Sequence, residues 1–522
     1  MQCDRSLCGP VGSIFQPCYS NGTNELRCSW EVCPVRVGII GAGMSGLFLA
    51  HHLAEAGIEY QIFEKRAGVG GTWYDNTYPG LHVDVITRSY EFPFARKNYW
   101  SKRYAPGSEI RRYLTDFAQE QGVVRHIRFN TEVRQAVWED DAWTLTLPDG
   151  SSEVFDVVVA ATGFLHVPKR PTFPGTDTFE GHSWHSSEWD HGVDLTGKRI
   201  GVVGTGSSGI QIVSELGKRC HDVKHFIRTP QWIQIRQNKK ISPLERVLLR
   251  VPSLAGYWDR RVAKLRVATE GSETWRLIPG DERTVQTQRF YDELAEAVPD
   301  PVLREKLTPK DPPGCKRIPK SPDYYQVVQR PNVTPVFGGV QRVEPNGIVD
   351  PDGTLHELDV IIYATGFDTH AYMRPMEVVG PAGLTVEKMW ADGVYSYRGI
   401  GLPGMPNFFL LNGPFAPVNS VAIPTCLRDE VGFLMRLLAT MQREGQALAP
   451  SEESTAAFCN TVRAALPGTT YSLCDNWYTD KGGVAIIWPF TRQRHADQYA
   501  DADIADFERF PARRELATPA RA

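Results

Sequence analysis

Residues 35–47 read VRVGIIGAGMSGL, a short apolar run that leads into a GxGxxG turn formed by Gly41, Gly43 and Gly46. A helix-periodic stretch follows, and a second apolar run, EYQIFE, ends in Glu64. Glycines let the backbone approach a pyrophosphate, the helix N-terminus offers free N–H groups, and the acid accepts from a ribose hydroxyl. This stretch predicts a strand–turn–helix–strand unit that binds a dinucleotide.

The same pattern recurs at residues 198–210, which read KRIGVVGTGSSGI. Here the second strand ends in Arg228, followed by Thr229, where the first unit ended in an acid. An arginine suits a 2′-phosphate, so the second dinucleotide is predicted to be NADP rather than NAD. The alternative is a surface arginine beside a loop. The predicted contacts in this turn are Gly204, Thr205, Gly206, Ser207, Ser208 and Gly209.

A third repeat pairs FDVVVAATGF at 155–164 with LDVIIYATGF at 358–367. Both are continuous apolar runs, typical of strands inside a parallel sheet, and both end in Ala-Thr-Gly, where bulk would obstruct a nucleotide or a chain crossing. The first copy precedes the second GxGxxG and the other follows it. An α/β fold is therefore predicted, with two Rossmann-like domains, one inserted into the other.

The repeats also predict the domain boundaries. The outer nucleotide-binding domain is expected to comprise residues 35–164 and 368–522, and the inserted one residues 165–367. Within the insert, residues 235–310 are charged and helix-prone, so a helical subdomain that could shape a substrate pocket is expected. Residues 1–34 are interpreted as a loosely ordered N-terminal extension.

Composition excludes several classes of protein. The formal net charge of -4 and pI of about 6.4 lack the basic excess that nucleic-acid binding needs. No window holds about 18 consecutive apolar residues, so no membrane span is expected. The N-terminus lacks a signal peptide's features, and a cytoplasmic protein is expected. Composition does not predict the oligomeric state.

The ten cysteines are unevenly distributed, with five among the first 33 residues and no CxxC pair. Zinc ribbons and dithiol redox centres therefore lack their signature. Scattered free thiols are expected, and a disulfide-bearing cap at the N-terminus is the alternative.

Two dinucleotide-binding domains in one chain imply hydride transfer between cofactors, with NADPH reducing a tightly bound flavin. A flavin disulfide reductase would need a redox cysteine pair, and none has the required spacing. Electrons would then pass to oxygen or to an external acceptor. A hydrolase is not expected, because the chain has no GxSxG elbow.

Two further segments carry a resemblance to a known family. Residues 70–84 read GGTWYDNTYPGLHVD, and residues 179–190 read FEGHSWHSSEWD. The first is similar to the GGTWYxNxYPGxxxD run of Baeyer–Villiger monooxygenases, and the second fits their FxGxxxHxxxW[P/D] fingerprint. The resemblance covers nearly all of residues 35–500. It implies FAD and NADPH as cofactors, and a C4a-peroxyflavin that, with O2 as co-substrate, converts a ketone into an ester or lactone.

The resemblance also implies site residues. Residues 314–319, GCKRIP, resemble the family segment that supplies a catalytic arginine, here Arg317, and Asp84 matches the aspartate that pairs with it. An always-charged guanidinium suits stabilisation of a peroxide and an oxyanion. Lys316 matches a lysine near the NADP 2′-phosphate, complementing Arg228 and Thr229. The residues implied around the flavin are Gly71, Thr72, Trp73, Asp84 and Tyr90.

The fingerprint residues 179–190 admit three interpretations: a metal site, a structural aromatic cluster, or a joint between the two cofactor domains. The histidine spacing matches no familiar metal motif, so no metal is expected. We favour the joint, in which His185 and Trp189 connect interdomain position to cofactor binding. Trp477 resembles a tryptophan that reaches NADP and closes over the substrate, although an aromatic residue here could equally belong to the core.

Two rival functions stay open at this point. The chain could be a flavin-containing monooxygenase that oxidises sulfur or nitrogen, since these related enzymes carry a shorter version of the fingerprint. It could also be a regulatory flavoprotein that binds nucleotides without productive turnover. The complete long fingerprint favours ketone oxidation.

Overall fold

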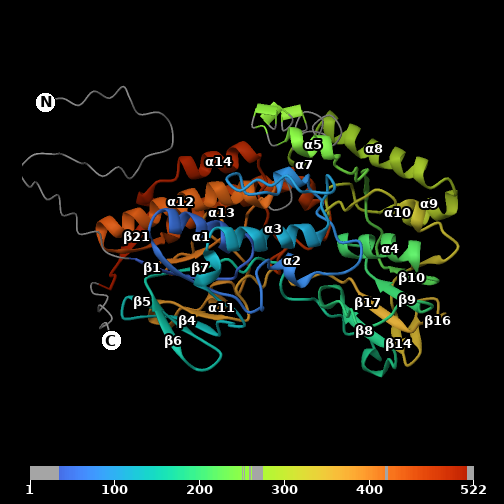
Figure 1. Cartoon of the computed structure of the whole chain (residues 1–522), viewed down its shortest axis with the longest axis horizontal. Helices are drawn as coiled ribbons and strands as arrows, with labels where there is room; N and C mark the ends of the chain where they lie inside the picture. Colours follow the sequence, from blue (N-terminus) through green and yellow to red (C-terminus); the bar gives the residue numbers. More distant parts are fainter. Residues whose placement is uncertain are drawn as a thin grey trace, which may run out of the picture.

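Two parallel five-stranded sheets organise the chain in the computed structural model, which describes residues 35–249, 251, 253–254, 256–257, 260–261, 274–417 and 421–513. The N-terminal extension and its five cysteines lie outside the described residues. Figure 1 shows the two sheets at opposite sides of the molecule. Two Rossmann-like domains are confirmed.

The first sheet has the strand order β19-β7-β1-β2-β3, all parallel. Its strands are β1 (Arg36–Ile40), β2 (Glu59–Phe63), β3 (Ile127–Arg128), β7 (Val157–Ala160) and β19 (Phe408–Leu410). The last strand comes from far along the chain, so the chain returns to this sheet after completing the second one. The apolar run before the first Ala-Thr-Gly is β7, which is buried along its whole length.

The second sheet has the order β13-β10-β9-β17-β8, also parallel. Its strands are β8 (His182–His185), β9 (Arg199–Val203), β10 (Asp222–Ile227), β13 (Val333–Phe337) and β17 (Val360–Tyr363). The apolar run before the second Ala-Thr-Gly is β17, in the same relation to β9 as β7 has to β1. The repeated sequences therefore fold as repeated structure.

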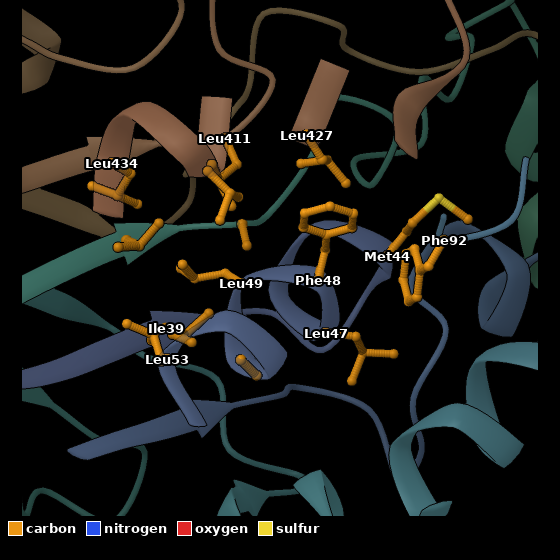
Figure 2. Packing of buried hydrophobic residues seen from close by; sticks show 14 of the residues in the cluster. Ile39, Met44, Leu47, Phe48, Leu49, Leu53, Phe92, Leu411, Leu427 and Leu434 are labelled. Carbon is orange, nitrogen blue, oxygen red and sulfur yellow. The ribbon is translucent and has the colours of Figure 1, made fainter. Parts of the chain in front are cut away.

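Each GxGxxG turn leads into a helix. The first helix is α1 (Met44–Glu55) and the second is α4 (Ser207–Arg219), and neither has a side-chain cap at its N-terminus. Helix α1 packs between the first sheet and α12 (Ile423–Glu444). In Figure 2, Phe48 and Leu49 of α1 point toward Leu411, Leu427 and Leu434. This apolar core fixes the first glycine turn at the carboxyl end of the sheet.

Smaller sheets flank the two large ones. The four-stranded sheet has the order β18-β4-β5-β6 and the three-stranded sheet β14-β15-β16. Their strands are β4 (Gln135–Glu139), β5 (Ala142–Thr146), β6 (Ser152–Phe155), β14 (Arg342–Glu344), β15 (Gly347–Val349), β16 (Leu355–Glu357) and β18 (Glu377–Val379). Short pairs join β11 (Gln234–Ile235) to β12 (Lys320–Ser321) and β20 (Ala447–Pro450) to β21 (Phe507–Phe510).

The remaining helices cover the sheets and the region between them. Those near the first sheet are α2 (Thr72–Asp75), α3 (Gly107–Glu120), α11 (Val386–Met389), α13 (Glu452–Ala465) and α14 (Arg492–Ala500). Those around the second are α8 (Asp281–Ala297), α9 (Pro301–Leu307) and α10 (Tyr324–Val327), while α5 (Pro243–Leu248) and α7 (Thr274–Leu277) lie at the top of Figure 1 between the two sheets. The segment expected to be helical thus contains helices in its described part. Among the described residues, no helix is long and apolar enough to cross a membrane.

Candidate active site

The first GxGxxG turn can be made only by glycines at two of its positions. Gly41 has φ +107, and a Cβ built on it would lie 2.8 Å from the carbonyl oxygen of Ala161. A Cβ on Gly46 would lie 2.0 Å from the carbonyl oxygen of Gly41. The alanine of the first Ala-Thr-Gly therefore packs directly against the turn. The GxGxxG and Ala-Thr-Gly motifs thus form one close-packed feature.

Glu64 follows β2 and faces this turn. Its carboxylate accepts hydrogen bonds from the backbone N–H groups of Ala42, at 2.7 Å, and Arg66, at 2.8 Å. Burial raises the pKa of Glu64, and these two hydrogen bonds oppose the shift. Glu64, which is predicted to accept a hydrogen bond from a ribose hydroxyl, thus lies beside the backbone of residues 41–43.

Residues 70–75 lie against the same turn. Gly70 donates its N–H to the carbonyl of Ala42 at 3.1 Å, and a Cβ built on Gly71 would lie 3.2 Å from the Cα of Gly43. Thr72 and Trp73 begin α2 immediately afterwards. The two glycine segments form a cradle without side chains, next to the uncapped N-terminus of α1. Such a cradle fits a pyrophosphate, and the residues present therefore fit FAD.

Arg317 and Asp84 form an ion pair although 233 residues separate them. Nε of Arg317 donates to Oδ2 of Asp84 at 3.0 Å, and Nη2 donates to Oδ1 at 2.7 Å and to Oδ2 at 2.6 Å. The two side chains are 30% and 18% exposed, so the pair is partly desolvated but reachable. A two-point contact of this kind fixes the plane of the guanidinium.

The pair shifts both ionisations toward the charged forms. Burial alone would raise the pKa of Asp84, but the charge and hydrogen bonds of Arg317 together hold it below its ordinary value. Burial alone would lower the pKa of Arg317, and Asp84 overcomes that effect, so the pKa of Arg317 is raised. The site therefore carries a permanent, oriented cation.

Tyrosine side chains lie close enough to this cation to interact with it electrostatically, and Trp73 contacts one of them, Tyr90. Trp73 donates its indole N–H to the hydroxyl of Tyr90 at 3.1 Å, with the rings edge to face and their centroids 5.6 Å apart. Burial raises the pKa of Tyr90 to about 12 despite the Trp73 hydrogen bond. Sequence reasoning missed Tyr478, a buried residue whose hydroxyl is electrostatically coupled to Arg317. It adjoins Trp477, so its position in that motif was the available signal.

The second glycine turn repeats the geometry of the first. Gly204 has φ +118, and its Cβ would lie 2.3 Å from the carbonyl oxygen of Ala364, while a Cβ on Gly209 would lie 2.1 Å from the carbonyl oxygen of Gly204. A Cβ on Gly206 would meet nothing within 4 Å. The backbone is therefore open at Gly206, immediately before α4, which starts with Ser207 and Ser208. These residues fit the pyrophosphate of NADP.

Arg228 lies directly after β10 and is exposed. Its neighbour Thr229 is tied to the turn, because the hydroxyl of Thr205 donates to the Thr229 carbonyl at 2.8 Å. Lys316 forms an ion pair with Asp311 at 2.6 Å. A shared contact of Lys316 and Arg228 with a 2′-phosphate stays a prediction.

The two nucleotide units meet through polar residues, of which Gln211 was not singled out by any motif. Tyr78 donates its hydroxyl to Oε1 of Gln211 at 3.1 Å and accepts from the hydroxyl of Ser208 at 3.2 Å. The amide of Gln211 donates to the carbonyl of His82 at 3.0 Å. Helix α4 of the second unit is therefore bonded to the segment that runs from α2 to Asp84.

His185 is fully buried at the end of β8. Its Nε2 lies 2.9 Å from the carbonyl oxygen of Gly366, and its Nδ1 lies 2.8 Å from the hydroxyl of Ser187. Gly366 belongs to the second Ala-Thr-Gly, where the chain leaves the second sheet. His182 is exposed while His185 is buried, so the structure does not bring these two histidines together as metal ligands.

One polar contact between the end of the fingerprint region and the flavin-side segment comes from His191, whose Nε2 lies 2.8 Å from the hydroxyl of Thr77. Trp189 instead packs edge to face against Trp184 of β8, with ring centroids 5.6 Å apart. A role of His185 and Trp189 in coupling the domains stays a prediction.

Trp477 packs face to face with Phe164, with ring centroids 6.2 Å apart and planes 15° apart. Its carbonyl accepts from the hydroxyl of Thr369 at 2.8 Å. Phe164 follows the first Ala-Thr-Gly, and Thr369 follows the second. Trp477 is therefore positioned at the crossing between the two nucleotide units, and its contact with NADP stays a prediction.

The expectation of free thiols is wrong at two positions. Cys315 and Cys474 form a disulfide, with Cα atoms 6.0 Å apart. Their separation of 159 residues has no characteristic spacing, which is why the sequence did not reveal the pair. The described free cysteines are Cys220, Cys426 and Cys459.

Comparison with known proteins agrees with this geometry. The family model for flavin-binding monooxygenase-like proteins matches residues 34–255. A Baeyer–Villiger monooxygenase of Streptomyces coelicolor is 33% identical over 488 residues, covering 91% of this chain and 92% of the relative. The chain belongs to the Baeyer–Villiger monooxygenases. An uncharacterized monooxygenase of Mycobacterium tuberculosis is 37% identical over 495 residues, covering 93% and 99% of the two chains.

Solved structures of Baeyer–Villiger monooxygenases share the whole architecture. OTEMO in complex with FAD and NADP superposes with a TM-score of 0.83 at 28% identity, covering 92% of this chain and 100% of that one. The closed form of cyclohexanone monooxygenase gives a TM-score of 0.82 at 28% identity, with the same coverage. The family resemblance of the motifs is thus confirmed over the full length of a Baeyer–Villiger monooxygenase.

Proposed function

We propose that the chain uses FAD, NADPH and O2 to convert a ketone into an ester or lactone, with Arg317 as its catalytic cation. The observation that carries the proposal is the two-point pairing of Arg317 with Asp84 beside Trp73 and Tyr90, which the family places around the flavin. Bound FAD would take hydride from NADPH and deliver an oxygen atom from O2 to the ketone.

The residues that would hold FAD are the glycine cradle and its neighbours. The N–H groups at the start of α1 would bind the pyrophosphate, and Glu64 the ribose. The flavin-side residues are Gly41, Gly43, Gly46, Glu64, Gly71, Thr72, Trp73, Asp84 and Tyr90. The NADP side would use the start of α4 with Arg228, Thr229 and Lys316, and His185 and Trp477 would position the joint.

We also propose residues 35–164 with 368–522 as the FAD domain and 165–367 as the NADP domain.

Arg317 would act by electrostatics without moving a proton. Asp84 keeps the guanidinium oriented before the reactants arrive, so little reorganisation is needed when negative charge develops on oxygen. The apolar rings of Trp73 and Tyr90 lower the local polarity, which strengthens the interaction of the cation with an anion. Removal of one preorganised donor of this kind costs about 100-fold or more in turnover.

The test is turnover of a ketone panel with NADPH under ¹⁸O2, followed by mass spectrometry. We expect an ester or lactone carrying one ¹⁸O atom and the release of one water per NADPH oxidised. Arg317→Ala should lose this product while retaining FAD. Arg342→Ala is the matched control, because Arg342 is an exposed arginine that pairs with Glu344 on β14.

Two results would overturn the proposal. The first is oxygenation of sulfides or amines without any ketone product, which would place the chain with the heteroatom-oxidising enzymes. The second is full ketone turnover by the Arg317→Ala variant, which would remove the assigned role from this residue.

A further inference from the structure

The disulfide between Cys315 and Cys474 joins the two irregular segments that carry site residues. Cys315 lies two residues before Arg317, and Cys474 three residues before Trp477. Residues 311–319 contain no helix or strand, and β12 begins only at Lys320. Backbone ladders therefore do not hold the Arg317 segment in place.

Weaker contacts accompany the covalent one. The hydroxyl of Thr470 donates to the carbonyl of Gly314 at 3.0 Å. The side-chain amide of Asn476 donates to the carbonyls of Tyr471, at 2.8 Å, and Cys474, at 3.1 Å, and lies 3.9 Å from the sulfur of Cys315. The disulfide thus sits at the centre of one contact between the two segments.

We propose that the Cys315–Cys474 disulfide is a redox-sensitive clamp that positions Arg317 and Lys316 against the Trp477 segment. The inference rests on the proposed function, because it assigns a control to that same site. With the bond intact, the segment of Arg317 is fixed at both ends, by the disulfide and by β12. With the bond reduced, only noncovalent contacts hold the N-terminal side of the segment, among them the Lys316–Asp311 ion pair, and NADP binding weakens.

The reduction is chemically balanced with a dithiol as reductant. A thiolate of the dithiol attacks the sulfur of Cys474, which is half-buried, whereas Cys315 is fully buried. Cys315 leaves as a thiolate and takes up a proton. The second thiol of the reductant then attacks the mixed disulfide, releases Cys474 as a thiol, and closes the reductant into a cyclic disulfide. Two electrons and two protons enter the protein.

The bond itself is tested first. The protein is purified without reductant, its free thiols are blocked with N-ethylmaleimide, and it is digested with trypsin. We expect residues 311–316 linked to residues 464–481, since Lys310, Lys316, Arg463 and Lys481 bound these peptides. Finding both cysteines alkylated instead would overturn the proposal.

The effect of the bond is tested by comparing holoenzyme before and after dithiothreitol treatment, with the reductant removed. We expect the Kd for NADP+ to rise on the order of tenfold and the KM for NADPH to rise with it. FAD should stay bound in both forms, because the glycine cradle and Glu64 lie outside these segments. Cleavage of the bond with no change in NADP+ affinity or KM would overturn the proposal.

Variants separate this effect from other thiols. The double variant Cys315→Ser with Cys474→Ser should match the reduced protein and should no longer respond to dithiothreitol. Cys220→Ser, which removes a free cysteine at the end of α4, should respond as the native protein does. If neither redox form oxidises any ketone, NADP+ affinity still reports on the clamp, so failure of the proposed function is distinguishable.

Discussion

The hydroxyl of Tyr78 donates a 3.1 Å hydrogen bond to the side-chain carbonyl of Gln211, and thereby connects the flavin-side segment to helix α4 of the second nucleotide unit. Both side chains are buried. The same hydroxyl accepts from Ser208, the second residue of that helix. The relative position of the two nucleotide sites thus depends on a small buried polar network as well as on apolar packing.

We expect Tyr78→Phe to lower the free energy of unfolding by about 1–3 kcal/mol, because the buried side-chain carbonyl of Gln211 then keeps only a long contact of 3.5 Å from the N–H of His82. The apolar ring is kept, so packing should change little. The thermal midpoint, followed by circular dichroism, checks this. Tyr291→Phe on α8 is the control, since Tyr291 is 43% exposed. Equal midpoints for the two variants would contradict the prediction.

We expect Asp84→Asn to reduce ketone turnover about 10-fold to 100-fold, because the amide no longer fixes Arg317 by charge. The pKa of Asp84 is lowered in the folded protein, so its pairing stabilises the fold above the ordinary carboxyl pKa and the stabilisation is lost as the pH falls through the folded value. The difference in thermal midpoint between native protein and variant should therefore shrink below about pH 4. A difference that grows in acid would contradict this assignment.

We expect Arg228→Ala to raise the KM for NADPH by about 10-fold to 100-fold and to leave the KM for NADH nearly unchanged. A hydrogen bond to a charged group contributes about 1.5–3 kcal/mol, and only NADPH carries the 2′-phosphate. Steady-state kinetics with both nucleotides checks this. Lys224→Ala, on strand β10 shortly before Arg228, is the matched control. If the KM values for NADPH and NADH rise equally, Arg228 does not recognise the 2′-phosphate.

The repeated motifs predicted most of the fold because their information is local. A glycine turn, its flanking strand and its helix lie within about 30 residues, and steric limits at Gly41 and Gly204 admit no other residue. The carbonyls of Ala161 and Ala364 behind these glycines explain why the Ala-Thr-Gly repeats accompany the turns.

The contacts of the site are non-local, and residue patterns alone did not predict them. Arg317 and Asp84 are 233 residues apart and were paired only through the family resemblance. Gln211 lies between Ile210 and Ile212 in a helix. A polar residue at a buried position was the single feature of the sequence that pointed to its contact. The Cys315–Cys474 pair carries no spacing signature, so only the tertiary structure could bring it together.

The first domain contains a buried acid, which we expect to give the free energy of unfolding an unusual dependence on pH. Glu430 of α12 is fully buried, and its carboxyl accepts the backbone N–H of Asn412 at 2.9 Å. The side chain of Asn412 in turn donates to the hydroxyl of Ser45 at 3.2 Å, in the first turn of α1. Burial raises the pKa of Glu430 to about 8, from an ordinary value of 4.5.

Glu430 therefore folds in its protonated form at neutral pH, whereas the unfolded chain has released that proton. Since the folded state binds more protons between the two pKa values, this group lowers the free energy of unfolding by up to ~1.4 kcal/mol per pH unit as the pH rises from 4.5 to about 8. We expect Glu430→Gln to match the native protein near pH 5 and to exceed its thermal midpoint at pH 8–9. The amide oxygen can still accept from Asn412, and Glu453→Gln, on the exposed start of α13, should leave the pH profile unchanged. A constant difference between the midpoints of the native protein and Glu430→Gln from pH 6 to 8 would show that Glu430 ionises in the folded protein well below pH 8.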